Sequence, residues 1–170
     1  MSRVLALLIM LFVFGFATLV DIKAGASGDT IETIRSQYAS INRNVRRYKK
    51  VKKELSGYST EGGTMEAYVD GASVKKIVAH FYGETGRADE EYYFWNDQLI
   101  FVFRKDSTYS RPLSGKVVST KENRFYFNNG HMIRWLNESG KQVPSSNSGY
   151  SEKQNEYLES SRKFTELAGT

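Results

Sequence analysis

The chain contains no cysteine and, in 170 residues, only two prolines and two histidines. Without cysteine there is no disulfide, no thiolate nucleophile and no lipid-modified cysteine, so the folded chain depends on its core alone. His80 and His131 each stand among aromatic neighbours, and no cysteine or further histidine lies at a zinc-binding spacing. We therefore expect no metal, no cofactor and no catalytic residue in this protein.

The first residues have the composition of an export signal. Arg3 precedes an apolar run of 17 residues, Val4 to Val20, and Ala24-Gly25-Ala26 supplies small side chains for a peptidase site. This pattern predicts a signal peptide over residues 1–26 and an exported protein, periplasmic or extracellular. The alternative is an uncleaved membrane anchor, because the run is near the short limit of about 17–25 residues for a spanning helix.

The rest of the chain divides into a domain, a loop and a terminal helix. Residues 27–139 are predicted to form a helix-plus-sheet domain. Residues 140–149 are rich in Ser, Gly and Asn and read as a loop. Residues 150–170 have the composition of a C-terminal helix, but their apolar stripe is thin, so the helix docks on the sheet weakly or moves freely.

An amphipathic helix is predicted to open the domain near Asp29. Apolar side chains recur there at steps of three and four, which places them on one face of a helix. The pattern extends to about Lys52, and Gly57 favours termination. The apolar residues are Ile31, Ile34, Tyr38, Ile41, Val45 and Tyr48.

Three β-hairpins are predicted beyond Gly63, because Asp-Gly and Asn-Gly tolerate the positive φ that tight turns require. They join residues 64–69 to 74–82, residues 90–95 to 99–103, and residues 124–127 to 131–136. The second and third hairpins match at an offset of 32 residues, so that Trp95-Asn96 corresponds to Phe127-Asn128. We predict an α+β fold in which the N-terminal helix packs on an antiparallel meander of about six strands, with a C-terminal helix. Residues 116–119 are either a seventh strand or part of a loop.

A cluster of seven basic residues occupies the second half of the predicted N-terminal helix. Five of them project opposite its apolar stripe: Arg43, Arg46, Arg47, Lys50 and Lys53. A solvated helix face is one interpretation, and contact with an anionic lipid, polysaccharide or partner protein is the other. Nucleic acid is not an expected partner outside the cytoplasm. The cluster comprises Arg43, Arg46, Arg47, Lys49, Lys50, Lys52 and Lys53.

The middle hairpin is apolar or aromatic on both faces, so either both faces are covered or one presents an aromatic patch to a partner. The longest connections beside it are predicted over residues 84–91 and 106–115. Loops on a rigid sheet often hold recognition residues. The candidate binding residues are therefore Arg43, Arg46, Arg47, Lys50, Tyr92, Trp95, Tyr109 and Arg111.

The tyrosine-rich hairpins at 91–96 and 124–130, behind a signal segment and an amphipathic helix, resemble small exported bacterial proteins of uncharacterised function. The resemblance implies no activity and no site residues. The layout is also loosely similar to secreted inhibitor modules, although those commonly depend on disulfides. We expect a non-enzymatic binding module of the cell envelope that contacts a protein or an anionic envelope component. The alternatives are an inhibitor-like protein, an unrecognised hydrolase, or a scaffold that self-associates through a strand edge.

Overall fold

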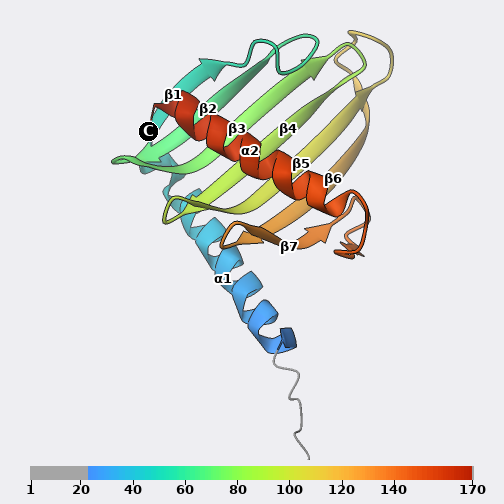
Figure 1. The fold of residues 1–170 in the computed structure, drawn as a ribbon. Coiled ribbons are helices and arrows are strands. Elements are labelled where there is room, and N and C mark those ends of the chain that lie inside the picture. Colours follow the sequence, from blue (N-terminus) through green and yellow to red (C-terminus); the bar gives the residue numbers. More distant parts are fainter. Residues whose placement is uncertain (1–22, 170) are drawn as a thin grey trace, which may run out of the picture.

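A computed structural model describes residues 23–169. The predicted signal peptide lies outside these residues, apart from its last four positions. The described chain is an antiparallel sheet between two helices (Figure 1). The elements are α1 (Lys23–Asn44), a 3-10 turn η1 (Val45–Arg47), β1 (Lys49–Glu54), β2 (Gly63–Asp70), β3 (Ser73–Gly83), β4 (Gly86–Trp95), β5 (Gln98–Tyr109), β6 (Val117–Asn128), β7 (His131–Leu136), β8 (Gln142–Val143) and α2 (Tyr150–Ala168).

The sheet is a simple meander, in which every strand pairs antiparallel with the next strand along the chain. The predicted α+β class is confirmed, and the described sheet has eight strands where about six were predicted. All three predicted hairpins are present, as β2–β3, β4–β5 and β6–β7. Their turns use the left-handed conformation at Gly71, Asn96 and Asn129, with φ of 61°, 49° and 49°. Turn chemistry therefore identified these hairpins correctly.

The strands are longer than the sequence suggested. Residues 86–91 belong to β4 and residues 106–109 to β5, so the predicted connections 84–91 and 106–115 are wrong over much of their length. The remaining connections are a turn at 84–85 and a loop at 110–116. Because β6 begins at Val117, the undecided segment 116–119 is mostly strand. Polar strand ends lack the apolar alternation that would have revealed them, and pairing with neighbouring strands decides their conformation.

The N-terminal helix was predicted to run from Asp29 to about Lys52, and both ends differ. Helix α1 begins at Lys23 and ends at Asn44, and the chain then turns through η1 into β1. Residues 49–54 pair with β2 over six positions, from Lys49 opposite Val69 to Glu54 opposite Thr64. The basic residues therefore do not share one helix face. Tertiary pairing outweighs the helical preference of lysine here.

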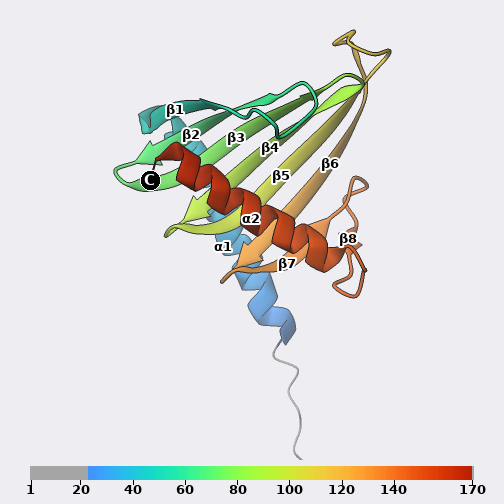
Figure 2. The ribbon, with the colours of Figure 1, turned by 45° about the horizontal axis from the view of Figure 1, so that its top comes forward.

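The two helices cover opposite faces of the sheet (Figure 2). Alternation along β4 sends Tyr92 to the α2 face and Tyr93 to the α1 face, and both side chains are completely buried. The middle hairpin is thus covered on both sides where the helices cross it, which decides between the two alternatives left open by the sequence.

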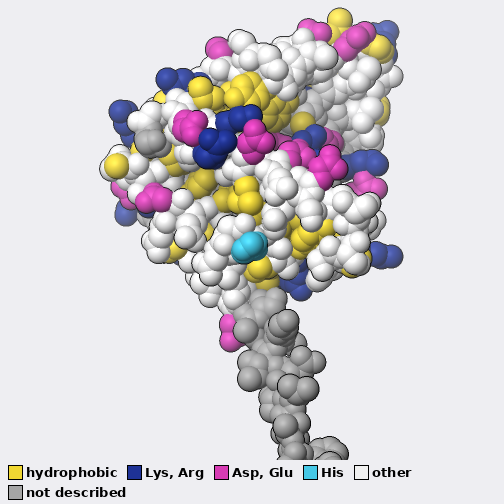
Figure 3. Space-filling model, in the orientation of Figure 1, with side chains coloured by type: hydrophobic (Ala, Val, Ile, Leu, Met, Phe, Trp, Pro, Cys, Tyr) yellow, Lys and Arg dark blue, Asp and Glu magenta, His cyan; other side chains and the backbone are white. Residues whose placement is uncertain are grey.

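Helix α2 docks through large rings and does not dock weakly. Tyr157 and Phe164 are buried, and the Phe164 ring lies 5.4–6.3 Å from the rings of Tyr58, Phe81 and Tyr92. The outward side of α2 is charged, with the ion pairs Lys163–Glu159 and Arg162–Glu166. Figure 3 shows this face of the molecule, with acidic and basic groups gathered across its middle. Helix α2 therefore packs its apolar side chains on the sheet and exposes a charged side to solvent.

Candidate functional site

The predicted basic residues meet at one edge of the sheet. Arg43 lies in the last turn of α1, Arg46 and Arg47 belong to the 3-10 turn, and four lysines follow on β1. We call the seven residues the basic edge: Arg43, Arg46, Arg47, Lys49, Lys50, Lys52 and Lys53. All seven are exposed. The chain changes from helix to strand within the cluster, so the lysines of β1 alternate between the two faces of the sheet while sharing one edge.

Strand β1 is an edge strand, since it pairs only with β2 in the part of the chain that is described. Lysines on an edge strand prevent uncontrolled pairing with other sheets. Two copies of β1 paired antiparallel would bring lysines of one copy against lysines of the other, which is unfavourable. The charge of β1 therefore disfavours self-association through this strand.

Only part of the positive charge at this edge is neutralised. Glu66 on β2 accepts ion pairs from Lys50 at 2.8 Å and from Lys52 at 3.0 Å. These hydrogen bonds lower the pKa of Glu66 to about 2. Among the described residues, no carboxylate lies within ion-pair distance of the other five basic side chains, which are Arg43, Arg46, Arg47, Lys49 and Lys53.

The aromatic and loop candidates are not part of one site with the basic edge. Tyr92 is in the core under α2, so it is not available to a partner at the surface. Trp95 lies at the tip of the β4–β5 hairpin and is 37% exposed. Tyr109 and Arg111 lie at the other end of β5, roughly 35 Å from Trp95 at about 3.3 Å per residue. The eight predicted residues therefore belong to four separate places: the basic edge, the core under α2, the β4–β5 tip and the far end of β5.

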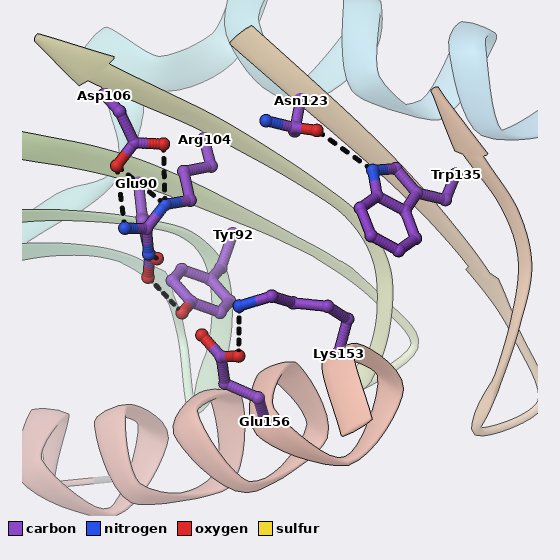
Figure 4. A network of polar contacts seen from close by, with 8 residues as sticks. All are labelled: Glu90, Tyr92, Arg104, Asp106, Asn123, Trp135, Lys153 and Glu156. Carbon is purple, nitrogen blue, oxygen red and sulfur yellow. Dashed lines mark hydrogen bonds and ion pairs between the residues drawn. The ribbon is translucent and has the colours of Figure 1, made fainter. Parts of the chain in front are cut away.

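The α2 face contains a polar network that the sequence analysis missed (Figure 4). Arg104 on β5 donates to Glu90 at 2.6 Å and makes a forked contact with Asp106 at 2.7–3.0 Å. The hydroxyl of Tyr92 donates to the other oxygen of Glu90. The sequence offered one sign of this network. Glu90 and Arg104 each stand two residues from an apolar residue on neighbouring predicted strands, which places each on the same face as that residue. Without the register they could not be paired.

Burial dominates the electrostatics of this network. Glu90 is only 4% exposed, and the loss of water raises the pKa of its carboxyl group even though Tyr92 and Arg104 favour the charged form. Burial and the neighbouring Glu90 raise the pKa of the Tyr92 hydroxyl well above its ordinary value. Because Arg104 and Tyr92 satisfy both oxygens of Glu90, the network is a structural connection between strands under α2 and not an open reaction centre.

The opposite face has a cavity of about 380 Å³ between α1 and strands β4–β6. Phe101, Phe103 and Tyr126 contribute aromatic walls, and two carboxylates, Glu91 and Glu122, line it as well. Each carboxylate is already paired, Glu91 with Lys76 at 2.8 Å and Glu122 with Arg124 at 2.7 Å. Two carboxylates in one cavity are the feature that a hydrolase would need, but these two are held as partners of cations.

His80 is placed by the fold beside an acid. Its Nδ1 atom lies 2.7 Å from Oδ1 of Asp89 on the neighbouring strand, and Arg87 contacts the other oxygen of Asp89 at 3.2 Å. A histidine oriented by a carboxylate is part of a nucleophile-activating triad. In the described structure no hydroxyl is hydrogen-bonded to this histidine, so the pair stands without a nucleophile.

Residues 23–169 were also searched for metal-binding groups and for membrane-spanning helices. No group of three or more metal-ligating side chains could hold an ion, and no helix is long and apolar enough to cross a bilayer. Comparison with known proteins found no matching family model, no similar curated protein and no similar solved structure.

Proposed function

We propose that this protein is an exported, non-enzymatic binding module of the cell envelope and that its basic edge contacts an anionic component of the envelope. Export is proposed from the predicted signal peptide over residues 1–26. The observation that carries the proposal is the five exposed cationic side chains at one edge, within eleven residues, that have no acidic partner in the described structure. A concentrated cationic surface of this kind attracts anionic headgroups by about 1 kcal/mol per basic residue.

Protection of a strand edge explains only part of this charge. Lysines on β1 serve that purpose, whereas Arg43, Arg46 and Arg47 precede the strand and contribute nothing to the blocking of its free backbone groups. The arginines form the part of the surface that a binding role explains and a structural role does not. They are also suited to phosphate groups, which guanidinium binds with two parallel hydrogen bonds.

Vesicle binding tests the proposal. The full exported protein is mixed with phosphatidylcholine vesicles that contain or lack anionic phosphatidylglycerol, and the bound fraction is measured by sedimentation. We expect binding only to the anionic vesicles. The double variant Arg46→Glu/Arg47→Glu should weaken it at least about 30-fold, from about 1 kcal/mol per charge.

The matched control is Lys116→Glu/Lys141→Glu, which changes the net charge equally. Both lysines are exposed, lie away from the basic edge and have no ion pair in the described structure. It should bind almost as well as the unmodified protein. Equal weakening in both variants would show that net charge alone drives binding, and no binding to anionic vesicles would contradict the proposal for lipid headgroups.

A further inference from the structure

A second surface notch lies between the N-terminal half of α1 and the tips of two hairpins. It has a volume of about 330 Å³. Thr33 and Gln37 of α1 form one side, and Trp95, Asn96, Asn128 and Asn129 from the β4–β5 and β6–β7 tips form the other. The volume falls within the range of about 300–1,000 Å³ that small-molecule sites occupy. We call it the hairpin-tip notch.

Residues from both copies of the internal sequence repeat line the notch. Trp95-Asn96 and Phe127-Asn128 are equivalent positions at an offset of 32 residues, and all four residues line the same notch. Positive φ at Asn96 and Asn129 fixes the two turns. The equivalent polar groups are thus presented together on rigid hairpin tips, and α1 lies across them.

No charged side chain lines the notch, although a quarter of the chain is charged. A ligand with a net charge would lose water there without gaining an opposite charge, which is unfavourable. The chemistry of the lining therefore selects a neutral ligand. This separates the notch from the basic edge and from the cavity beside Glu91, both of which are charged.

The polar groups that line the notch are mostly primary amides. The side chains of Gln37, Asn96, Gln98, Asn128 and Asn129 have no hydrogen-bond partner within the described residues. Turn geometry accounts for asparagine at 96 and 129, since these positions have positive φ, but it requires no amide at 37, 98 or 128. Each amide offers two donors and an acceptor, which suits a ligand that carries many hydroxyl groups.

Trp95 supplies the apolar part of the site. Its side chain is 37% exposed, and its ring packs against no other aromatic ring in the described structure. The face of an indole ring is electron-rich and attracts the weakly positive C–H groups of a saturated ring. A ligand with one apolar C–H face and a rim of hydroxyl groups would satisfy both the tryptophan and the amides.

We infer that the hairpin-tip notch binds a neutral sugar residue of a glycan, with the ring stacked on Trp95 and the hydroxyl groups bonded by the surrounding amides. This site is independent of the proposed function of the basic edge. A single sugar unit is small, so the affinity should be about millimolar for one residue.

The indole N–H resonances of the protein provide the test, because the chain has two tryptophans. Trp135 lies on the α2 face, where it donates to Asn123 at 3.0 Å, and serves as the internal reference. Neutral tetrasaccharides of α-glucose, β-glucose, mannose and N-acetylglucosamine are titrated into the full exported protein. We expect at least one to shift the Trp95 signal saturably while the Trp135 signal stays unchanged.

Variants separate the site from general surface effects. Trp95→Ala should weaken binding at least about tenfold, measured by calorimetry, and Gln37→Glu should weaken it without removing the tryptophan. Tyr82→Ala is the matched control, because Tyr82 is 38% exposed and lies on β3 away from the hairpin tips. No Trp95 shift with any of the four sugars, equal weakening by Tyr82→Ala, or a shift caused only by a neutral proline-rich peptide would overturn the inference.

Discussion

The face of the sheet under α2 and the face under α1 share the same strands, yet eighteen buried residues form the core of the first and seven form the core of the second. On the α2 face one charged side chain, that of Glu90, is enclosed and only 4% exposed. On the α1 face the charged pairs beyond the helix are partly exposed, as His80–Asp89 and Lys52–Glu66 are. The α2 face therefore contains the larger apolar core, and the α1 face has several partly exposed ion pairs.

The difference follows from how each helix lies on the sheet. Helix α2 inserts Tyr157 and Phe164 between rings of the strands. Helix α1 contacts the sheet through three isoleucines, Ile31, Ile34 and Ile41, and through one partly exposed ring, Tyr38. Its first turns project beyond the sheet edge (Figure 1). The second arrangement leaves the cavity beside Glu91 and the hairpin-tip notch along the margins of α1. Incomplete cover by α1 thus leaves these two hollows open at the surface.

The largest effect is expected from Phe164→Ala, which removes a buried ring from the centre of the α2 face. Loss of a buried phenylalanine typically costs about 3–5 kcal/mol, as lost burial and an unfilled cavity. Urea unfolding followed by circular dichroism measures the free energy of unfolding. Phe164→Leu keeps an apolar side chain and should cost under about 1.5 kcal/mol. A loss below about 1 kcal/mol for Phe164→Ala would mean that α2 contributes little to the core.

A smaller loss is expected from Arg104→Met, which leaves the buried Glu90 carboxylate without its cation. Breaking a buried pair from one side costs about 3–5 kcal/mol, and partial exposure of Arg104 should reduce this to about 2–3 kcal/mol. The double variant Glu90→Gln/Arg104→Met should recover much of the loss, because no unpaired charge remains.

The variant Arg124→Met gives the matching loss of unfolding free energy for an ion pair on the α1 face. Arg124 pairs with Glu122 on the α1 face, where both side chains are more than a third exposed. Water replaces the lost partner there, so we expect a cost of under about 1 kcal/mol in the same urea experiment. Equal losses at Arg104 and Arg124 would contradict the distinction between an enclosed face and an open one.

Local chemistry predicted the hairpins, because Asp70-Gly71, Asn96-Asp97 and Asn129-Gly130 determine their own turns. It did not predict β1. The sequence of residues 49–54 is Lys-Lys-Val-Lys-Lys-Glu, in which Val51 is the only apolar residue, so no alternation marks a strand. The partner strand β2 supplies the backbone hydrogen bonds, and its position depends on the whole fold.

The same limit applies to the candidate sites. The sequence revealed the basic edge as a group because its residues lie within eleven positions. The helical conformation predicted for all of them was wrong for the residues of β1. The hairpin-tip notch was not found, since Gln37 and Asn128 are far apart in the chain and meet only when α1 crosses the hairpin tips. The sequence repeat showed that Trp95 and Phe127 are equivalent, but it could not show that both border one notch.

The smallest expected effects are opposite responses to acid on the two faces. On the α1 face, Lys50 and Lys52 hold the pKa of Glu66 at about 2, below its ordinary 4.5. The native state therefore binds this proton less readily than the unfolded state, and the contribution of Glu66 is present above about pH 4.5 and is lost as the pH falls towards 2. We expect about 1 kcal/mol, because water screens this partly exposed pair.

Glu90 has the opposite sign. Burial raises its pKa, so the native state binds the proton more readily than the unfolded state, and its charged form destabilises the fold above the ordinary pKa. On acidification from neutral pH towards 4.5, the unmodified protein should gain stability relative to Glu90→Gln. From 4.5 towards 2 it should lose stability relative to Glu66→Gln. Unfolding free energies of the three proteins, measured at the same series of pH values, test both signs. If the two variants differ from the unmodified protein by a constant amount at every pH, neither carboxyl group has the environment that its face of the sheet provides.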